Sequence, residues 1–410
     1  MSVPAITNNP APFAPVAFTG RNGTFRRLVT RGALLELVTF GFYRFWLATD
    51  IRRHLWSRTE IHGDALEYIG RGKELLFGFL IAMAVLGPVF LVYFVIGLQF
   101  EWLKAFASVP LYVLLFAFGQ FAAYRARRYR LTRTVWRGVR FWMTGSGWSY
   151  AWRSALWGLL LLPTLGFAYP WRVAALERYK LSHTLYGNLP GRFEAIGWQL
   201  FKRVWWVWLL GLLLFLLLFA GILLFAGIVG AAAHVPLAFR GLPARAATIA
   251  TGGAILLVTL SLVALAFLHA IRRAKEWAWW AEGIRFGRVA VTCHLRAGSL
   301  IGIYWKLIGL GLLVFVSYAV VAAGLTALVG PSAMLGKLAA WGFAAHAVMY
   351  LLLLVSFGVL ARIYTLQRVW RRVIEACAVI NIEDAADVAA AGDVVNAFGE
   401  GLADGLDFGL

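Results

Sequence analysis

The stretch from Glu36 to Leu75, ELVTFGFYRFWLATDIRRHLWSRTEIHGDALEYIGRGKEL, sets the pattern for the whole chain. A Thr39-Phe-Gly41 step leads into an aromatic segment that ends at Trp46. A basic helix is predicted from Asp50 to Ser57. A short alternating segment then turns at Gly63-Asp64, and a long apolar run follows it.

Pieces of this pattern recur downstream in the same order. The copies are Pro163-Thr164-Leu165-Gly166 with Arg178-Tyr179-Lys180 and Gly187-Asn188, and partial copies that begin at Arg127-Arg128-Tyr129 and at Arg272-Arg273. A repeated unit between long apolar runs is typical of membrane proteins built from internal copies. We therefore predict one integral membrane domain, residues 18–382, with internal repeats at 18–124, 125–271 and 272–382.

The composition excludes an ordinary soluble domain. Hydrophobic residues make up 61% of the chain, charged residues only 14%, and the mean hydropathy is +0.75. Typical soluble domains are about 45–50% apolar. The net charge of +20 does not require a nucleic-acid partner, because Lys and Arg concentrate in the loops on one side of a membrane.

Six apolar runs are long enough to span a bilayer, which takes roughly 20 residues. They form three pairs, 75–98 with 105–124, 204–229 with 246–271, and 300–328 with 338–363. The turns within the pairs and their edges hold only four of the 39 basic residues. The positive-inside rule then predicts a multi-pass membrane protein with both termini in the cytoplasm.

Two further segments, 25–49 and 152–176, carry too much charge or too many prolines for ordinary spans. We predict broken helix pairs, interrupted near Gly41 in the first and at Pro163 and Pro170 in the second. Irregular backbone at membrane depth requires cover from protein or water. The sequence leaves open whether these segments cross the membrane fully.

Short alternating segments lie between the helices. Gly63-Asp64 and Gly187-Asn188 are two-residue turn signals, and Arg137-Gly138 and Glu282-Gly283 are weaker ones. We predict up to four small cytoplasmic β-hairpins, which gain stability by joining in one sheet. The predicted class is an all-α polytopic membrane protein with three transmembrane hairpins, broken or interfacial helices and these small β-hairpins.

The two ends differ in character. Residues 1–17 are rich in Pro, Asn and Ala and are predicted to form a flexible tail. Residues 383–410 contain seven acidic residues and no basic one. Apolar residues recur there at near-helical spacing, so we predict that 394–408 docks against the basic cytoplasmic face.

These motifs together resemble the YjgN-like family of bacterial inner-membrane proteins, a family of unknown function. The resemblance rests on Phe18-Thr-Gly20, Thr39-Phe-Gly41-Phe-Tyr43-Arg-Phe-Trp46, Gly70-Arg-Gly72-Lys-Glu74-Leu, Thr164-Leu-Gly166 with Pro170-Trp171-Arg172, and the acidic ending from Gly399 to Asp407. It extends from about residue 18 to the end of the chain. It implies a location and a topology but no reaction.

Five polar residues within the apolar segments are candidates for a functional site: Lys306, His346, Gln120, Arg31 and Glu36. Ionisable groups inside a membrane often mark a substrate or ion path. Three of them also have a structural alternative. Lys306 can extend to the interface, His346 can be a packing histidine, and Gln120 can form an interhelical hydrogen bond.

A second set of residues suits anionic lipid head groups, because arginines and interfacial aromatics bind them together. It comprises Arg127, Arg128, Arg272, Arg273 and Trp277. Membrane lipids, anionic ones above all, are therefore the predicted partners. Two cysteines, Cys293 and Cys377, indicate neither a disulfide framework nor a metal site. We predict no cofactor and no enzymatic activity.

The sequence favours transport or permeation of a small or amphipathic substrate, because repeats and interrupted helices often frame a transport site. The alternative is a non-transporting membrane scaffold that organises lipids through its basic cytoplasmic face. A polar path across the bilayer distinguishes the two, since transport requires one and a scaffold does not.

Overall fold

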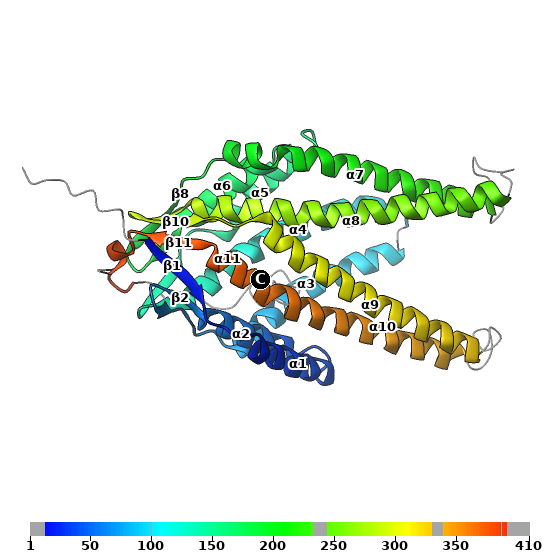
Figure 1. The fold of residues 1–410 in the computed structure, drawn as a ribbon, viewed down its shortest axis with the longest axis horizontal. Coiled ribbons are helices and arrows are strands. Elements are labelled where there is room, and N and C mark those ends of the chain that lie inside the picture. The colour runs from blue at the N-terminus through cyan, green and yellow to red at the C-terminus, as the bar shows by residue number, and fades with distance from the viewer. Residues whose placement is uncertain (1–12, 100, 233–243, 330–338, 387, 392–410) are drawn as a thin grey trace, which may run out of the picture.

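The computed structural model describes residues 13–99, 101–232, 244–329, 339–386 and 388–391. Its strands gather at one end of the molecule, and its long helices extend from them in one general direction (Figure 1). Within these residues the chain is a succession of five units, each a strand, two helices and a strand. Two units have short helices and three have long ones.

The five units follow the chain in order. The first contains β1 (Phe13–Phe18), α1 (Asn22–Val38), α2 (Arg44–Trp56) and β2 (Thr59–Ile61). The second contains β3 (Asp64–Ala65), β4 (Glu67–Tyr68), α3 (Gly72–Gln99), α4 (Glu101–Thr132) and β5 (Thr134–Trp136). The third contains β6 (Val139–Met143), α5 (Gly147–Leu161), α6 (Tyr169–Ser182) and β7 (Thr184–Tyr186).

The fourth unit contains β8 (Leu189–Phe193), α7 (Gly197–Ala232), α8 (Ala244–Glu282) and β9 (Ile284–Phe286). The fifth contains β10 (Val289–Cys293), α9 (Ala297–Val329), α10 (Ala339–Ala361), the π-helix η2 (Arg362–Leu366), α11 (Gln367–Glu375) and β11 (Cys377–Ile380). α10, η2 and α11 follow one another without a gap, so the second helix of this unit bends through a π turn.

The connections between strands and helices are uniform. Every outgoing strand is followed by three residues and then by the first helix of its unit. On the return, Thr59, Thr134 and Thr184 each donate a hydroxyl hydrogen bond of 2.8 Å to a carbonyl four residues earlier, in the helix that has just ended. These bonds satisfy carbonyls that the end of a helix leaves free. The same short connection therefore sets each pair of helices on the sheet.

The sheet nearly closes on itself. Its strand order is β3-β2-β1-β11-β10-β9-β8-β7-β6-β5-β4, and the two strands at its ends, β3 and β4, are joined in the chain by Leu66 alone. The Leu66 amide donates to the Thr59 carbonyl (3.0 Å), and the Ile69 amide donates to the Arg133 carbonyl (2.9 Å). The sheet is therefore nearly closed into a ring, which leaves little free edge where another strand could add.

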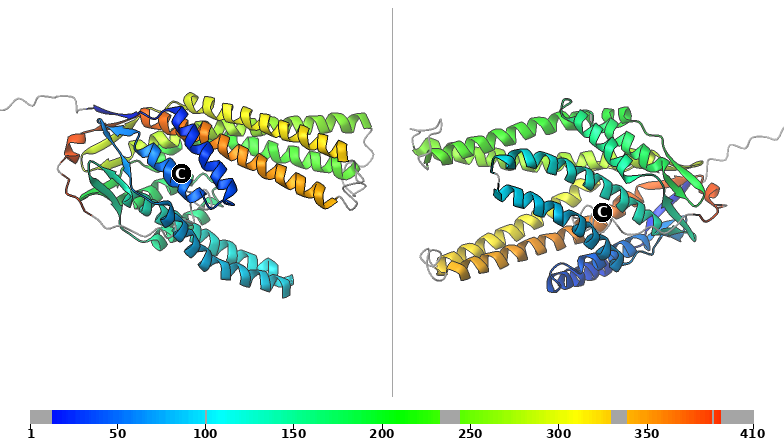
Figure 2. Two further views of the ribbon diagram at one scale, coloured as in Figure 1. Left: turned by 90° about the horizontal axis from the view of Figure 1, so that it is seen from below. Right: turned by 180° about the vertical axis from the view of Figure 1, so that it is seen from behind.

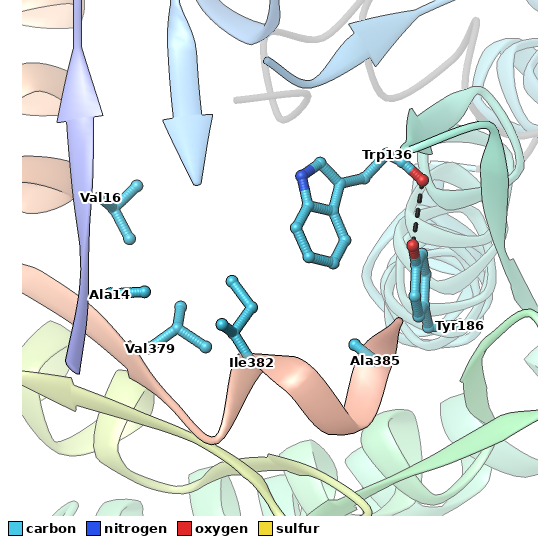
Figure 3. Packing of buried hydrophobic residues seen from close by; sticks show 7 residues of the cluster. All are labelled: Ala14, Val16, Trp136, Tyr186, Val379, Ile382 and Ala385. Atoms are coloured by element: carbon cyan, nitrogen blue, oxygen red, sulfur yellow. Dashed lines mark hydrogen bonds between the residues drawn. The ribbon is translucent and has the colours of Figure 1, made fainter. Parts of the chain in front are cut away.

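Apolar side chains fill the inside of this ring (Figure 3). Alternate residues of β1, Ala14 and Val16, point inward and are buried. Beyond β11 the chain reverses at Asn381, which has a left-handed backbone with φ of 57°, and enters the 3-10 helix η3 (Ile382–Ala385). Ile382, 2% exposed, packs in the ring, so the start of the C-terminal segment is part of the core.

Six helices are long and apolar enough to cross a membrane. At 1.5 Å per residue, the 36 residues of α7 measure about 54 Å against a hydrocarbon core of about 30 Å, so part of the helix must lie outside the membrane. The α3/α4 hairpin leans away from α7–α10 (Figure 2). Most side chains of the spans are exposed, as expected of lipid-facing helices.

Several predictions agree with this structure. All six predicted spans are helices, and both charged segments are helix pairs, with breaks at residues 39–43 and 162–168. The predicted second break at Pro170 is wrong, because Pro170 lies in the first turn of α6, where proline is tolerated. The β-hairpins are joined in one sheet, with turns at Arg137-Gly138 and Gly187-Asn188 as predicted. The first turn is at His62-Gly63, one residue earlier than the predicted Gly63-Asp64, because Asp64 already belongs to β3.

Other predictions need correction. The predicted class is incomplete, because it includes up to four small β-hairpins, whereas the described residues form one 11-stranded sheet that also contains β1, β4 and β11. Glu282-Gly283 is not a turn between strands, since α8 ends there and the turn comes at Gly287-Arg288. Strand β1 begins at Phe13, inside the predicted N-terminal tail, because its alternating residues pair with β11 and β2.

The three predicted repeats, bounded at residues 124 and 271, end inside α4 and α8 rather than between elements. The predicted docking of 394–408 lies outside the described residues.

The ring brings the two cysteines together although they are far apart in the sequence. Cys293 of β10 and Cys377 of β11 are directly opposed, with sulfur atoms 2.8 Å apart. Opposed residues of an antiparallel pair are close enough for a disulfide. We expect diamide to join them within one chain, seen as the loss of two thiols and as a linked peptide pair by mass spectrometry. Cys377→Ser should abolish the link, and a purely intermolecular link would contradict the register.

Candidate functional site

The first short hairpin reverses direction through a specific turn between α1 and α2. Phe40 and Gly41 have positive φ angles of 51° and 89°. The Gly41 amide donates to the Glu36 carbonyl at 2.7 Å. The Thr39 hydroxyl donates to a carbonyl in the last turn of α1 at 2.7 Å and accepts the Tyr43 amide at 2.9 Å. The turn therefore satisfies much of its own polar backbone, as a turn at membrane depth requires.

The second short hairpin, between α5 and α6, repeats this turn. Leu165 and Gly166 have φ angles of 47° and 83°, and the Gly166 amide donates to the Leu161 carbonyl at 2.9 Å. The Thr164 hydroxyl donates to a carbonyl in the last turn of α5 at 2.8 Å and accepts the Ala168 amide at 3.4 Å. The shared Thr-x-Gly sequence is thus the signature of one helix-reversing turn.

Both tips expose large apolar side chains. Phe40 is 94% exposed, Leu162 74% and Leu165 70%. Exposure of several such side chains together is unfavourable in water but suits hydrocarbon. α1 also stops well short of the far ends of α9 and α10 (Figure 1). The tips are therefore suited to end inside the membrane rather than to cross it.

A pocket of about 510 Å³ lies between the α5/α6 tip and the long helices α7 and α8. The tip contributes Leu165 and Phe167, and the long helices contribute apolar side chains such as Trp208, Phe215 and Leu268. We call it the first tip pocket. Its volume is within the range of known small-molecule sites, about 300–1,000 Å³.

One end of the first tip pocket is polar. Tyr169 and Arg272 line it, and both bind Glu276, which is 7% exposed. The Tyr169 hydroxyl donates to one carboxylate oxygen of Glu276 at 2.6 Å, and Arg272 Nη1 donates to the other at 2.7 Å. Arg273 approaches the same carboxylate at 3.8 Å. Two cations thus face one carboxylate, which leaves an excess of positive charge beside the pocket.

A second pocket of about 520 Å³ lies between the α1/α2 tip and α10. Phe40 and Gly41 of the tip form one wall, and Leu351 and Val355 are among the residues of the other. We call it the second tip pocket. Like the first, it is lined mainly by apolar side chains and lies beside a tip that exposes apolar side chains.

The second tip pocket also has a polar end. Arg362 Nη1 donates to a carboxylate oxygen of Glu36 at 2.8 Å, and both residues line the pocket. Arg362 is the first residue of the π-helix η2, and such local distortions of a helix are frequent at functional sites. Each tip pocket therefore combines apolar walls with an arginine–carboxylate pair, an arrangement that suits a ligand with an apolar chain and a polar head.

The predicted intramembrane residues do not form one site. Glu36 belongs to the second tip pocket, and Arg31 is exposed on α1. Lys306 lines a different pocket, together with Arg368 and Arg372. His346 lies half-buried on α10.

Gln120 takes part in an interhelical hydrogen-bond network. Its side-chain oxygen accepts from the Ser154 hydroxyl of α5 at 2.9 Å. Ser154, which is fully buried, in turn accepts from Arg172 of α6 at 3.0 Å. This network connects α4 with the second short hairpin, as the structural alternative for Gln120 predicted.

The residues predicted to bind lipid head groups make contacts within the protein. Arg127 binds Glu177 at 3.3 Å, and Lys180 binds the same carboxylate. Burial alone would raise the pKa of Glu177, but Lys180 and Arg127 outweigh it and hold that pKa below its usual value. The carboxylate therefore stays charged at neutral pH. Trp280 of α8 also donates to it at 3.0 Å, so the cluster connects α4, α6 and α8.

Three more of these residues lie on α8, and one on α4. Arg272 and Arg273 share Glu276, and the Arg273 guanidinium lies 5.1 Å from the centre of the Trp277 ring. Trp277 also packs beside Ala274 in a cluster that joins α8 to α9. Arg128, on α4, is half-buried.

Sequence reasoning found only part of the polar ends of the tip pockets, namely Arg272 and Arg273 at the first and Glu36 at the second. Tyr169, Glu276 and Arg362 were not candidates. Tyr169 binds Glu276, and Arg362 binds Glu36, and in each pair the two residues are more than 100 residues apart in the chain. Glu276 also pairs with arginines close to it in sequence. One signal was present. Thr-x-Gly-Phe occurs at residues 39–42 and again at 164–167, and each copy borders one of the pockets.

The tip turns give a stability prediction. Alanine at either tip glycine must adopt a positive φ, which costs more than about 1 kcal/mol. At Gly166 a Cβ would also lie 3.0 Å from the Trp208 ring, whereas at Gly41 it would meet open space. Gly166→Ala should therefore lower the melting temperature of the purified protein more than Gly41→Ala does. Gly158→Ala, within α5, is the control and should not lower it; equal melting temperatures for all three variants would refute the shared turn.

Comparisons with known proteins place the chain in a family. The model of the family described as "Bacterial protein of unknown function (DUF898)" matches residues 13–405. A curated relative, the inner membrane protein YjgN of Salmonella typhimurium, is 26% identical over 150 residues, which are 37% of this chain and 35% of the relative. The alignment thus spans about a third of either protein. No solved structure matches the chain. The chain belongs to the DUF898 family.

Proposed function

We propose that this chain is a multi-pass protein of the bacterial inner membrane that binds amphipathic molecules, membrane lipids above all, in its two tip pockets. The observation that carries the proposal is the shared design of these pockets. Each lies beside an apolar tip, has mainly apolar walls and ends at an arginine–carboxylate pair. A lipid chain fits the walls, and a polar head group can reach the charged end.

The long helices support lipid contact rather than a charged path across the membrane. Beyond the level of Arg272, Lys306 and Arg362, the described residues of the six spans toward their far ends contain no Asp, Glu, Lys or Arg, except Glu101 and Lys104 near the start of α4 and Arg245 at the start of α8. Their large apolar side chains are widely exposed. Such a surface is suited to lipid, and lipids beside it have direct access to the tips.

The closed sheet is proposed to lie in the cytoplasm. The turns at the far ends of the three long hairpins hold only four of the 39 basic residues, and the positive-inside rule places the basic side in the cytoplasm. The inner-membrane relative agrees with the proposed membrane. In this orientation the tip pockets receive lipids from the cytoplasmic leaflet.

Transport of an amphipathic substrate is the second candidate. It is favoured by the two broken hairpins, because interrupted helices that end inside the membrane often frame transport sites. In transport, a lipid taken up at a tip pocket must reach the other leaflet. Lipid binding alone requires no such movement, so a flux measurement separates the two functions.

Lipid occupancy can be tested by filling the pockets. Gly211 lines the first tip pocket and Gly358 the second, and a Cβ on either meets no atom closer than 3.9 Å. We expect phosphatidylglycerol with a photoreactive acyl chain, in liposomes, to label peptides around Leu165 and Phe40 in the wild type. Gly211→Phe should reduce labelling at the first tip and Gly358→Phe at the second, each by about tenfold, because the new ring occupies the site of the chain.

Gly324→Phe is the matched control, since Gly324 is exposed on α9 and a Cβ there meets open space. It should change neither signal. Uniform labelling of all lipid-facing helices, unaffected by the filling variants, would contradict the proposal. Transfer of a fluorescent lipid between the leaflets of these liposomes, lost in Gly211→Phe or Gly358→Phe, would favour transport over binding alone.

The orientation can be tested separately by thiol labelling. In a background without Cys293 and Cys377, we expect a membrane-impermeant maleimide added outside spheroplasts to modify Ala232→Cys, at the end of α7. Asn188→Cys and Arg137→Cys, at the sheet turns, should react only after the membrane is opened. Labelling of Arg137→Cys in intact spheroplasts would reverse the proposed orientation.

A further inference from the structure

A third pocket of about 410 Å³ lies where the start of α1 meets α9 and α11. Four cationic residues line it: Lys306 of α9, and Arg368, Arg371 and Arg372 of α11. It shares no residue with the tip pockets. Its concentration of positive charge is the first sign of an anion site.

Among the residues that the structure describes, three of the four cations have no carboxylate partner. Within the described residues, no Asp or Glu lies within 4.0 Å of Lys306, Arg368 or Arg372. Arg371 is held within the protein, because it donates to the Gly20 carbonyl and lies 4.0 Å from Glu375. Arg368 stacks on the Tyr364 ring, 4.8 Å from its centre, which orients the guanidinium, and no described carboxylate neutralises its charge.

The start of α1 adds hydrogen-bond donors to this pocket. Asn22, the first residue of the 17-residue helix, lines it, and the preceding Arg21 gives no side-chain cap. The first amides of α1 therefore lack helical partners and carry the positive end of the helix dipole. Phosphate groups bind readily at such a helix start.

A buried amide beside the pocket supplies an independent indication. Gln367 is 2% exposed, yet its Nε2 has no hydrogen-bond partner among the described residues. It lines an adjoining cavity of about 220 Å³, which Arg26 also lines and which shares Asn22 and Arg368 with the cationic pocket. A buried donor without a partner costs about 1–3 kcal/mol, which a bound oxygen acceptor would offset.

The pocket lies at the boundary between the polar and apolar parts of the helices. Lys306 is the last charged residue of α9 before an apolar stretch that continues to Val329. On the neighbouring helix, the charged residues begin at Arg362, directly after α10. Basic pockets between membrane helices at this level bind phosphate head groups.

We propose that this cationic pocket binds a phosphate ester, with Lys306, Arg368 and Arg372 as charge partners and the start of α1 as donor. The same chemistry is present in an anionic phospholipid head group and in a soluble phosphate ester. The site does not depend on the function proposed for the tip pockets.

The test uses the full chain in nanodiscs of phosphatidylcholine, with and without phosphatidylglycerol. Native mass spectrometry measures retained phosphatidylglycerol, and equilibrium dialysis measures the binding of glycerol 3-phosphate. Retained lipid that glycerol 3-phosphate does not displace identifies a head group as the ligand. Saturable binding of glycerol 3-phosphate in phosphatidylcholine alone identifies a soluble ester.

Charge removal shows whether the binding is at this site. The double variant Lys306→Gln, Arg368→Gln should bind the probe with an affinity at least about tenfold lower, because two charge-assisted contacts are lost. Arg372→Gln, at an exposed residue, should weaken it less. Arg27→Gln with Arg31→Gln removes two exposed charges from α1 outside the pocket and should change binding less than about twofold.

Further variants separate this site from folding defects and from the tip pockets. Lys306→Arg with Arg368→Lys should retain binding, and Gly211→Phe and Gly358→Phe should leave it unchanged. The Cys293–Cys377 disulfide that diamide is expected to form serves as the check that each variant is folded, because it requires the two thiols to be brought together. The proposal would be overturned if neither probe binds saturably. It would also be overturned if the wild type, Arg372→Gln and the folded double variant all bind the probe equally.

Discussion

The closure of the sheet is the constraint on which the rest of the structure depends. β3 and β4 are short, but they are continuous through Leu66, and this single residue joins the two ends of the strand order. Each pair of helices starts and ends at neighbouring strands of the ring. Because three residues always separate the outgoing strand from its helix, the ring determines where each helix enters the membrane.

The ring also explains why pockets form where they do. Helices of unequal length start from a common base, so a short hairpin ends beside long helices that continue past it (Figures 1 and 2). The space at each tip is bordered by a Thr-x-Gly turn and by a long helix. Ion pairs such as Arg362–Glu36 lie at the inner end of this space, where the long helices leave the apolar region.

The sequence revealed the parts of the fold that obey local rules. Apolar runs identified the six spans, and charge and proline identified the two broken hairpins. The ring escaped prediction because its pairs are distant in the chain, as between Phe13 and Ile380. The sequence pointed to candidate residues one at a time, such as Lys306 and Glu36. Arg368, which lines a pocket with Lys306, and Arg362, which binds Glu36, come from other helices. Only the folded ring brings them together.

The central claim is that an apolar chain occupies each tip pocket while the outer spans carry no polar path. The most direct measurement is an electron cryomicroscopy map of the full chain in nanodiscs of bacterial lipids. The account predicts elongated density beside Leu165 and beside Phe40, each ending near Arg272 or Arg362. Tip pockets closed by their own side chains, or a continuous water-filled channel to the far ends of the long helices, would contradict it.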